Sequence, residues 1–170
     1  MFIFVFGIAR IAAMKNLPVL GDSLTESAMI DTRTAPYAAL LLRIALGVMF
    51  LAHGLTKLLV FTLPGTAQFF AKIGFAGWLA YPVTFFEIGA GVLLILGVVP
   101  RWVAVIATVQ LFVASTVHFG NGWGFSNPNG GWEYPIFLSV AAAVLALLGD
   151  GKFALVKSCL LYTSPSPRDS

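Results

Sequence analysis

The sequence predicts an all-α integral membrane protein whose main body is a bundle of four transmembrane helices. Hydrophobic residues make up 59% of the 170 residues and charged residues only 10%, whereas soluble domains carry about 25% charged residues. Long apolar runs with almost no charge recur at residues 37–60, 78–99, 102–119 and 132–149. A helix needs roughly 17 to 25 apolar residues to cross a bilayer, so each run is long enough to span it.

The backbone's need for hydrogen bonds favours helices over strands in these runs. Inside lipid, every N–H and C=O must be satisfied within a helix or within a closed barrel. Barrel strands alternate polar and apolar residues, and none of the four runs does so. The runs are therefore predicted to be helices.

The segments around the runs divide the chain into three regions. Residues 1–36 are predicted to be a polar or interfacial lead-in, residues 37–157 the four-helix transmembrane domain, and residues 158–170 a Ser/Pro tail. We expect Met14 to be an alternative start and the tail to be a non-native extension. The single cysteine, Cys159, lies in that tail, so the chain alone cannot form a disulfide.

The three connections between the runs differ in character. Residues 61–77 carry phenylalanines around Lys72 and predict a short interfacial helix whose aromatic rings anchor it at the headgroup level. The link Pro100-Arg101 is so short that the second and third runs should form a tight antiparallel hairpin. Residues 120–131 are rich in Gly and Asn and predict an ordered turn or a lid.

Positive charges predict the orientation in the membrane. An even number of spans puts both termini on one side, and that side would carry most of the Lys and Arg, while the other would carry Lys57 and Lys72. By the positive-inside rule both termini are expected to be cytoplasmic. The protein is thus predicted to be a multi-pass protein of the plasma (inner) membrane with the lipid bilayer as its main partner. The formal charge of +3 is scattered, which argues against nucleic-acid binding.

Ionisable side chains inside the predicted spans form the candidate site. A charge at membrane depth costs at least about 2.5 kcal/mol, so each should be paired, snorkel to the interface or serve function. Arg43, His53 and Lys57 fall on one face of the first run, within an arc of roughly 80°. Gly47 and Gly54 lie near the same direction, where glycine allows a neighbouring helix to approach closely.

The predicted topology also sets the depth of these groups. His53 and Lys57 lie in the outer half of the first run, and Glu87 lies about 14 Å into the second at 1.5 Å per residue. Arg43 lies alone toward the cytoplasm. We expect a polar pocket that opens outward under the Gly-rich connection. Its expected members are His53, Lys57, Glu87, Gln110, His118 and Glu133.

Structural interpretations compete with the functional ones. Arg43 suits a snorkelling or helix-pairing charge as well as a substrate contact. Lys57 and Glu133 stand near span ends, where an interfacial position is equally natural. Glu87 is deep enough that it must pair with Lys57 or His53, or stay protonated, and a functional role is the default interpretation of such an acid.

The two histidines leave further alternatives open. His53 and His118 suit structural hydrogen bonding as well as a site. A bis-histidine haem or a metal held by two histidines and a carboxylate has no support from tight ligand spacing. We therefore predict no metal.

Four ordered blocks carry a resemblance to a known family. They read L-R-I-A-L-G-V-M-F-L-A-H-G-L-T-K-L at residues 42–58, F-E-I-G-A-G-V-L-L-I-L-G-V-V-P-R at residues 86–101, G-W-E-Y at residues 131–134 and G-D-G-K at residues 149–152. Together they resemble the DoxX family of small bacterial and archaeal membrane proteins. The resemblance implies four membrane helices and an oxidoreductase, or a membrane component of sulfur, thiol or quinone metabolism. The positions it marks are Arg43, His53, Gly54, Lys57, Glu87, Gly97 and Glu133.

The leading functional prediction is a DoxX-like redox component linked to quinone or to thiol/sulfur metabolism. Its candidate catalytic residues, which would handle a proton or an anionic substrate, are Glu87, His53 and Lys57. Its polar pocket would be completed by Arg43, Gln110, His118 and Glu133. The cofactor is unknown, and quinone is a candidate because its reduction needs protons at membrane depth, which a buried acid beside a histidine can relay. Against a redox role, the sequence lacks a dinucleotide fingerprint, a haem-attachment motif and a cysteine cluster.

Two other classes of function stay open. One is a small proton-coupled transporter, which with so few spans would work as a dimer. The other is a non-catalytic membrane anchor for a soluble enzyme. The candidate partners are accordingly a redox protein and a second copy of the chain.

Overall fold

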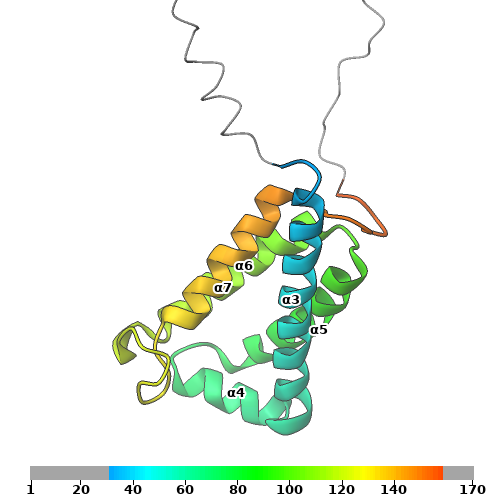
Figure 1. Ribbon diagram of the computed structural model, residues 1–170. Coiled ribbons are helices and arrows are strands. Elements are labelled where there is room, and N and C mark those ends of the chain that lie inside the picture. Colours follow the sequence, from blue (N-terminus) through cyan, green and yellow to red (C-terminus); the bar gives the residue numbers. More distant parts are fainter. Residues whose placement is uncertain (1–30, 159–170) are drawn as a thin grey trace, which may run out of the picture. The chain divides into compact units, whose positions relative to one another are not determined.

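All regular structure in the computed structural model is helical within residues 31–158, which are the residues that the structure describes. The predicted all-α class is confirmed for this range (Figure 1). The helices are α3 (Ala35–Leu55), α4 (Leu63–Lys72), α5 (Ala80–Leu96), α6 (Pro100–Thr116) and α7 (Glu133–Leu148). The predictions about Met14, Cys159 and most of the lead-in and tail lie outside the described residues.

Three short helical turns complete the fold. Single 3-10 turns occupy Gly77–Leu79 before α5 and Phe119–Asn121 after α6. The third, Thr56–Val60, is a π-helical turn that continues α3 directly. Its wider winding is closed by the Phe61 N–H, which donates to the Thr56 carbonyl at 3.0 Å. The sequence predicted one uniform helix to residue 60, because an apolar run does not distinguish α from π winding.

Glycine and proline set the helix ends. Gly97 ends α5 in the left-handed region at φ 72°, which glycine adopts without a Cβ penalty. Pro100 stands at the start of α6, where its missing N–H costs no hydrogen bond. The turn between these helices is therefore residues 97–99 and not the predicted Pro100-Arg101.

The long helices pack as two pairs. α5 packs along α3, and α6 packs along α7, with fewer contacts between the pairs. This corrects the prediction of a tight hairpin between the second and third runs. The turn joining them bonds to a different segment, since the Val99 N–H donates to the Val156 carbonyl at 2.9 Å. A short connection thus fixes only the ends of α5 and α6.

Glycine allows the close approach of α3 and α5. A Cβ added at Gly91 would lie 2.6 Å from the Leu51 backbone nitrogen, and one added at Gly54 would lie 2.9 Å from the backbone nitrogen of Ile88. Gly47 faces α5 in the same way, at Ile95. The prediction that glycines on this face admit a neighbouring helix is confirmed.

Polar side chains lie inside and large apolar ones outside. Arg43, Thr84, Glu87, Ser115 and Ser139 are all buried. By contrast, exposed side chains on the long helices include Leu41, Phe137 and Leu147, the last 83% exposed. By length and composition, two helical stretches can cross a membrane, Ala35–Val60 and Gly77–Leu96, while α6 and α7 are apolar but shorter.

The helices have two distinct ends (Figure 1). At the first, which we call the strap end, residues 149–158 run across the start of α3 and the α5–α6 turn, and the Lys152 N–H donates to the Pro36 carbonyl at 2.9 Å. At the second, the α4 end, lie α4 and the loop of residues 117–132. The apolar core between them centres on Phe50, Leu94, Ala107, Leu111 and Leu145.

Candidate functional site

A buried carboxylate on α5 is the centre of the candidate site. The Glu87 side chain, on a residue 7% exposed, accepts a hydrogen bond from Lys57 Nζ at 2.6 Å and another from Gln110 Nε2 at 2.9 Å. The two donors reach different carboxylate oxygens. Three predicted site residues from separate helical elements therefore meet at one point, which we call the Glu87 cluster.

Local backbone features bring Lys57 to Glu87. Gly54 stands one turn before Lys57, and a Cβ there would lie 3.1 Å from the Glu87 Cβ, so glycine lets α5 pass close by. Lys57 lies in the π-helical turn, a type of distortion that is frequent at functional sites. Thr66 on α4 fixes the start of that helix, its hydroxyl donating to the Thr62 carbonyl at 2.9 Å.

An apolar cavity of about 420 Å³ adjoins the Glu87 cluster. Phe69, Phe70 and Phe75, from α4 and the residues after it, line one side, and α6 residues such as Val113 line the other. Its volume lies in the range of roughly 300 to 1,000 Å³ that is typical of small-molecule sites. The sequence predicts that these phenylalanines anchor residues 61–77 at the headgroup level. Their clustering around Lys72 was the available sequence signal of a cavity wall.

Two polar residues, Gln110 and His118, contribute to the wall of this cavity. The Oε1 atom of Gln110 is buried and has no hydrogen-bond partner among the described residues. His118, also in the wall, has Nδ1 3.1 Å from the Gly130 carbonyl oxygen, a distance at which a protonated Nδ1 donates. Gln110 thus has an unused acceptor buried beside the cavity.

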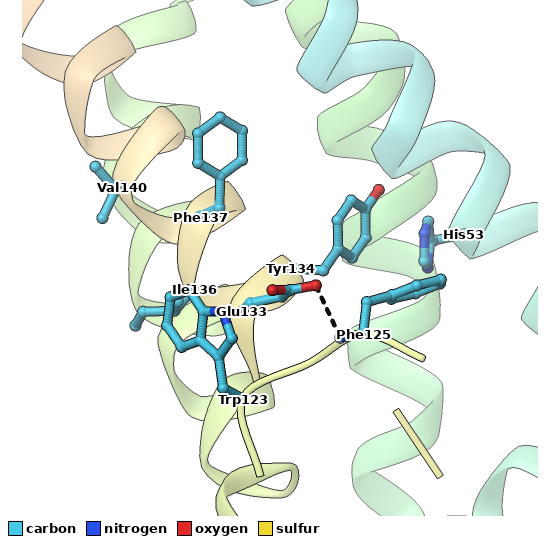
Figure 2. Close-up of a pocket in the computed structure, with 8 residues that line it drawn as sticks. All are labelled: His53, Trp123, Phe125, Glu133, Tyr134, Ile136, Phe137 and Val140. Carbon is cyan, nitrogen blue, oxygen red and sulfur yellow. Dashed lines mark hydrogen bonds between the residues drawn. The ribbon is translucent and has the colours of Figure 1, made fainter. Parts of the chain in front are cut away.

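His53 and Glu133 line a different cavity. This second cavity, of about 940 Å³, is lined by α3 and α7 residues together with the loop before α7, and we call it the α3–α7 groove (Figure 2). Its wall also holds Trp123, Phe125, Tyr134 and Phe137. His53 is exposed, and its ring makes no hydrogen bond within residues 31–158. The structure thus divides the predicted cluster between two cavities.

A third cavity joins His53 to Lys57. It has a volume of about 770 Å³ and lies between the end of α3 and α4, with Phe61, Thr66 and Phe69 in its wall. His53 therefore borders the second and third cavities, and Lys57 borders the first and third. None of the three is lined by both His53 and Glu87.

The loop before α7 folds back on itself to form one wall of the α3–α7 groove. The Glu133 carboxylate accepts the Phe125 N–H at 2.8 Å (Figure 2), and the Glu133 N–H donates to the Trp123 carbonyl at 3.2 Å. The backbone carbonyls of Trp123 and Gly124 leave no room for a Cβ at Gly131. The loop is an ordered turn, and its role as a lid stays a prediction.

Arg43 lies apart from all three cavities, at the strap end. Its guanidinium donates to the Asp150 carbonyl at 3.1 Å and to the Lys152 carbonyl at 3.4 Å. The residue is only 1% exposed and packs against Gly97, where a side chain would collide with it. These contacts tie residues 150–152 to α3 and give Arg43 a structural role.

The Glu87 cluster has the composition of a proton-handling site. A carboxylate held by an ammonium and an amide beside an apolar cavity can exchange a proton with a ligand hydroxyl or carbonyl. Within residues 31–158 no three His, Cys, Asp or Glu side chains come together in a way that would hold a metal ion. The side chains that can carry chemistry at this site are those of Lys57, Glu87 and Gln110.

The fold and site define a small helical protein with two membrane-capable stretches and a buried carboxylate site beside a ligand-sized cavity. Residues 38–120 match the model of the DoxX family, the family that the sequence blocks resemble. The matched segment contains the whole Glu87 cluster and ends before the groove residues of α7.

One curated relative carries a functional name. The chain is 39% identical over 75 residues to a protein of Bacillus subtilis (strain 168) named "Putative oxidoreductase CatD". The alignment covers 44% of this chain and 54% of CatD, so the chain spans about half the length of that relative. No solved structure matches the chain significantly.

Proposed function

We propose that this chain is a DoxX-type component of a membrane redox system linked to quinone or thiol/sulfur metabolism. The observation that carries the proposal is the Glu87 cluster, a buried carboxylate paired with Lys57 at 2.6 Å and facing an apolar cavity of about 420 Å³. A buried acid in a membrane segment costs too much free energy to be an incidental feature. The name of the Bacillus subtilis relative, "Putative oxidoreductase CatD", agrees with this class.

We further propose that the chain lies in the plasma (inner) membrane as four spans with both termini cytoplasmic. The apolar outer surface of the long helices supports insertion, because lipid is the solvent that tolerates residues such as Leu41, Phe137 and Leu147 in the open. Arg33, Arg101 and Lys157 lie toward the strap end, in agreement with a cytoplasmic position for it. The α4 end would then face outward.

In this proposal the cluster supplies protons to a lipophilic acceptor. Reduction of a quinone to a quinol takes two electrons and two protons, and the electrons would come from a redox protein partner. Glu87 would hold the first proton beside the quinone oxygen, and Lys57 would return a proton to the carboxylate from the neighbouring cavity that reaches His53. Gln110 would orient the carboxylate through its amide N–H.

The test is mass spectrometry of the small molecules extracted from detergent-purified protein, together with an absorption spectrum. The native chain is compared with Glu87→Gln, which keeps the side-chain shape but removes the charge. Glu133→Gln is the matched control, because it makes the same change in a carboxylate outside the cavity. We expect bound quinone in the native chain and in the control, and its loss from Glu87→Gln.

Other outcomes would redirect the proposal. Equal quinone in all three samples would show that the Glu87 cavity is not its site. No quinone, flavin or haem in any sample would contradict the redox role. Uptake driven by a proton gradient in proteoliposomes would then favour a small proton-coupled transporter, and function that survives Glu87→Gln would favour a non-catalytic anchor.

A further inference from the structure

The α3–α7 groove contains a carboxylate that has no basic partner. Glu133 accepts the Phe125 N–H at 2.8 Å and forms no salt bridge with any residue in the described part of the chain. His53 lines the groove too but is not within ion-pair distance of Glu133. Glu133 stands in the first turn of α7, where the helix dipole stabilises a negative charge.

Exposed aromatic rings line the groove around this carboxylate. Trp123, Phe125, Tyr134 and Phe137 line the groove, and each is at least 41% exposed. The rings of Phe125 and Tyr134 stand 5.8 Å apart at 64°. In Figure 2 the Glu133 carboxylate is drawn between Trp123 and the Phe125–Tyr134 pair. Because the face of an aromatic ring is electronegative, all these groups attract positive charge.

We propose that the α3–α7 groove binds an organic cation that carries a quaternary or methylated ammonium group. Such a group is large, weakly hydrated and apolar at its surface, so it gains from aromatic faces as well as from a nearby carboxylate. A compact metal cation would need several oxygen ligands, whereas Glu133 is the only carboxylate in the wall. The groove volume of about 940 Å³ leaves space for such an ion with a chain attached to it.

The same chemistry has two sources, a lipid headgroup such as that of phosphatidylcholine and a free organic cation from the aqueous side. Phe137 and Val140 are exposed on the apolar surface of α7, and Trp123 and Phe125 are exposed in the loop before it, so either source has access. The experiment below separates them through the lipid in which the protein is embedded.

The test is calorimetric titration of the full chain in phosphatidylglycerol nanodiscs. The probes are choline and 3,3-dimethyl-1-butanol, which has the shape of choline without its charge. Glu133→Gln removes the charge but keeps an oxygen that can accept the Phe125 N–H, so the loop is retained. Tyr134→Leu removes a ring, Tyr134→Phe keeps it, and Lys72→Met, on an exposed residue that lines none of the three cavities, is the control.

We expect saturable choline binding that Glu133→Gln and Tyr134→Leu each weaken by about tenfold, while Tyr134→Phe and Lys72→Met bind as the native chain does. The neutral alcohol should bind at least about tenfold more weakly than choline. Weaker choline binding in phosphatidylcholine nanodiscs would identify a lipid headgroup as the occupant, and unchanged binding a free cation. Equal binding of choline and the alcohol, binding indifferent to Glu133→Gln, or no saturable binding would overturn the proposal.

Discussion

Removing one member of the Lys57–Glu87 ion pair should destabilise the protein far more than removing both. At 2.6 Å and an effective dielectric constant of about 20, the attraction between the two charges is on the order of 6 kcal/mol. The side chains are only 19% and 9% exposed, so the pair is largely withdrawn from water. Loss of one partner from a buried pair typically costs about 3 to 5 kcal/mol. We expect each single change to cost about 3 kcal/mol, the low end of this range, because Lys57 retains some exposure.

The measurement is the midpoint of thermal unfolding of the purified protein in one detergent, for Lys57→Met, Glu87→Gln and the double variant. A loss of about 3 kcal/mol corresponds to about 6 to 12 °C for a chain of this size. The double variant should recover much of that loss, because no uncompensated charge is left inside. Lys72→Met, on an exposed residue of α4, is the control and should change little. Losses that simply add in the double variant would refute the reasoning, since they would show that the two charges do not interact.

Three further predictions concern packing and loop geometry. Gly91→Ala should separate α3 from α5 and cost about 1 to 3 kcal/mol, seen as a lower unfolding midpoint, because its Cβ would lie 2.6 Å from the Leu51 nitrogen. Arg43→Met should speed amide hydrogen exchange at Lys152 and Val156, because it leaves two carbonyls of the strap without their donor; unchanged exchange would exclude this role. Gly131→Ala should alter Trp fluorescence by displacing the Trp123 backbone, and an unaltered spectrum would contradict the tight loop.

The positions of the long helices could be predicted from the sequence because membrane-length apolar runs constrain the backbone strongly. The sequence predicts that Glu87 pairs with Lys57 or His53 or stays protonated, since all three residues fall in the outer half of the bundle. The structure selects Lys57. Helical spacing alone could not decide this, because the π-helical turn at residues 56–60 changes the direction in which Lys57 points.

The division of the site into two cavities could not be predicted from depth. Depth places Glu87 and Glu133 in the same outer half of the bundle, but which cavity each faces depends on how the helix pairs pack across the bundle. Phe125 and Trp123 line the groove because the loop that carries them closes through hydrogen bonds of its own backbone. Such hydrogen bonds leave no periodic pattern of apolar residues in the sequence. The sequence therefore predicted an ordered loop, but not that its aromatic side chains line the groove.

The contacts at the strap end have a mechanical consequence. Arg43 joins α3 to residues 150–152, and Val156 joins the same segment to the turn between α5 and α6, so this end fixes all four long helices together. The two helix pairs are therefore held together at the strap end. Motion that separates α3 and α5 from α6 and α7 should therefore grow with distance from Arg43. This motion should be largest at the α4 end, where the three cavities lie. A ligand can then enter a cavity while the contacts at the strap end stay intact.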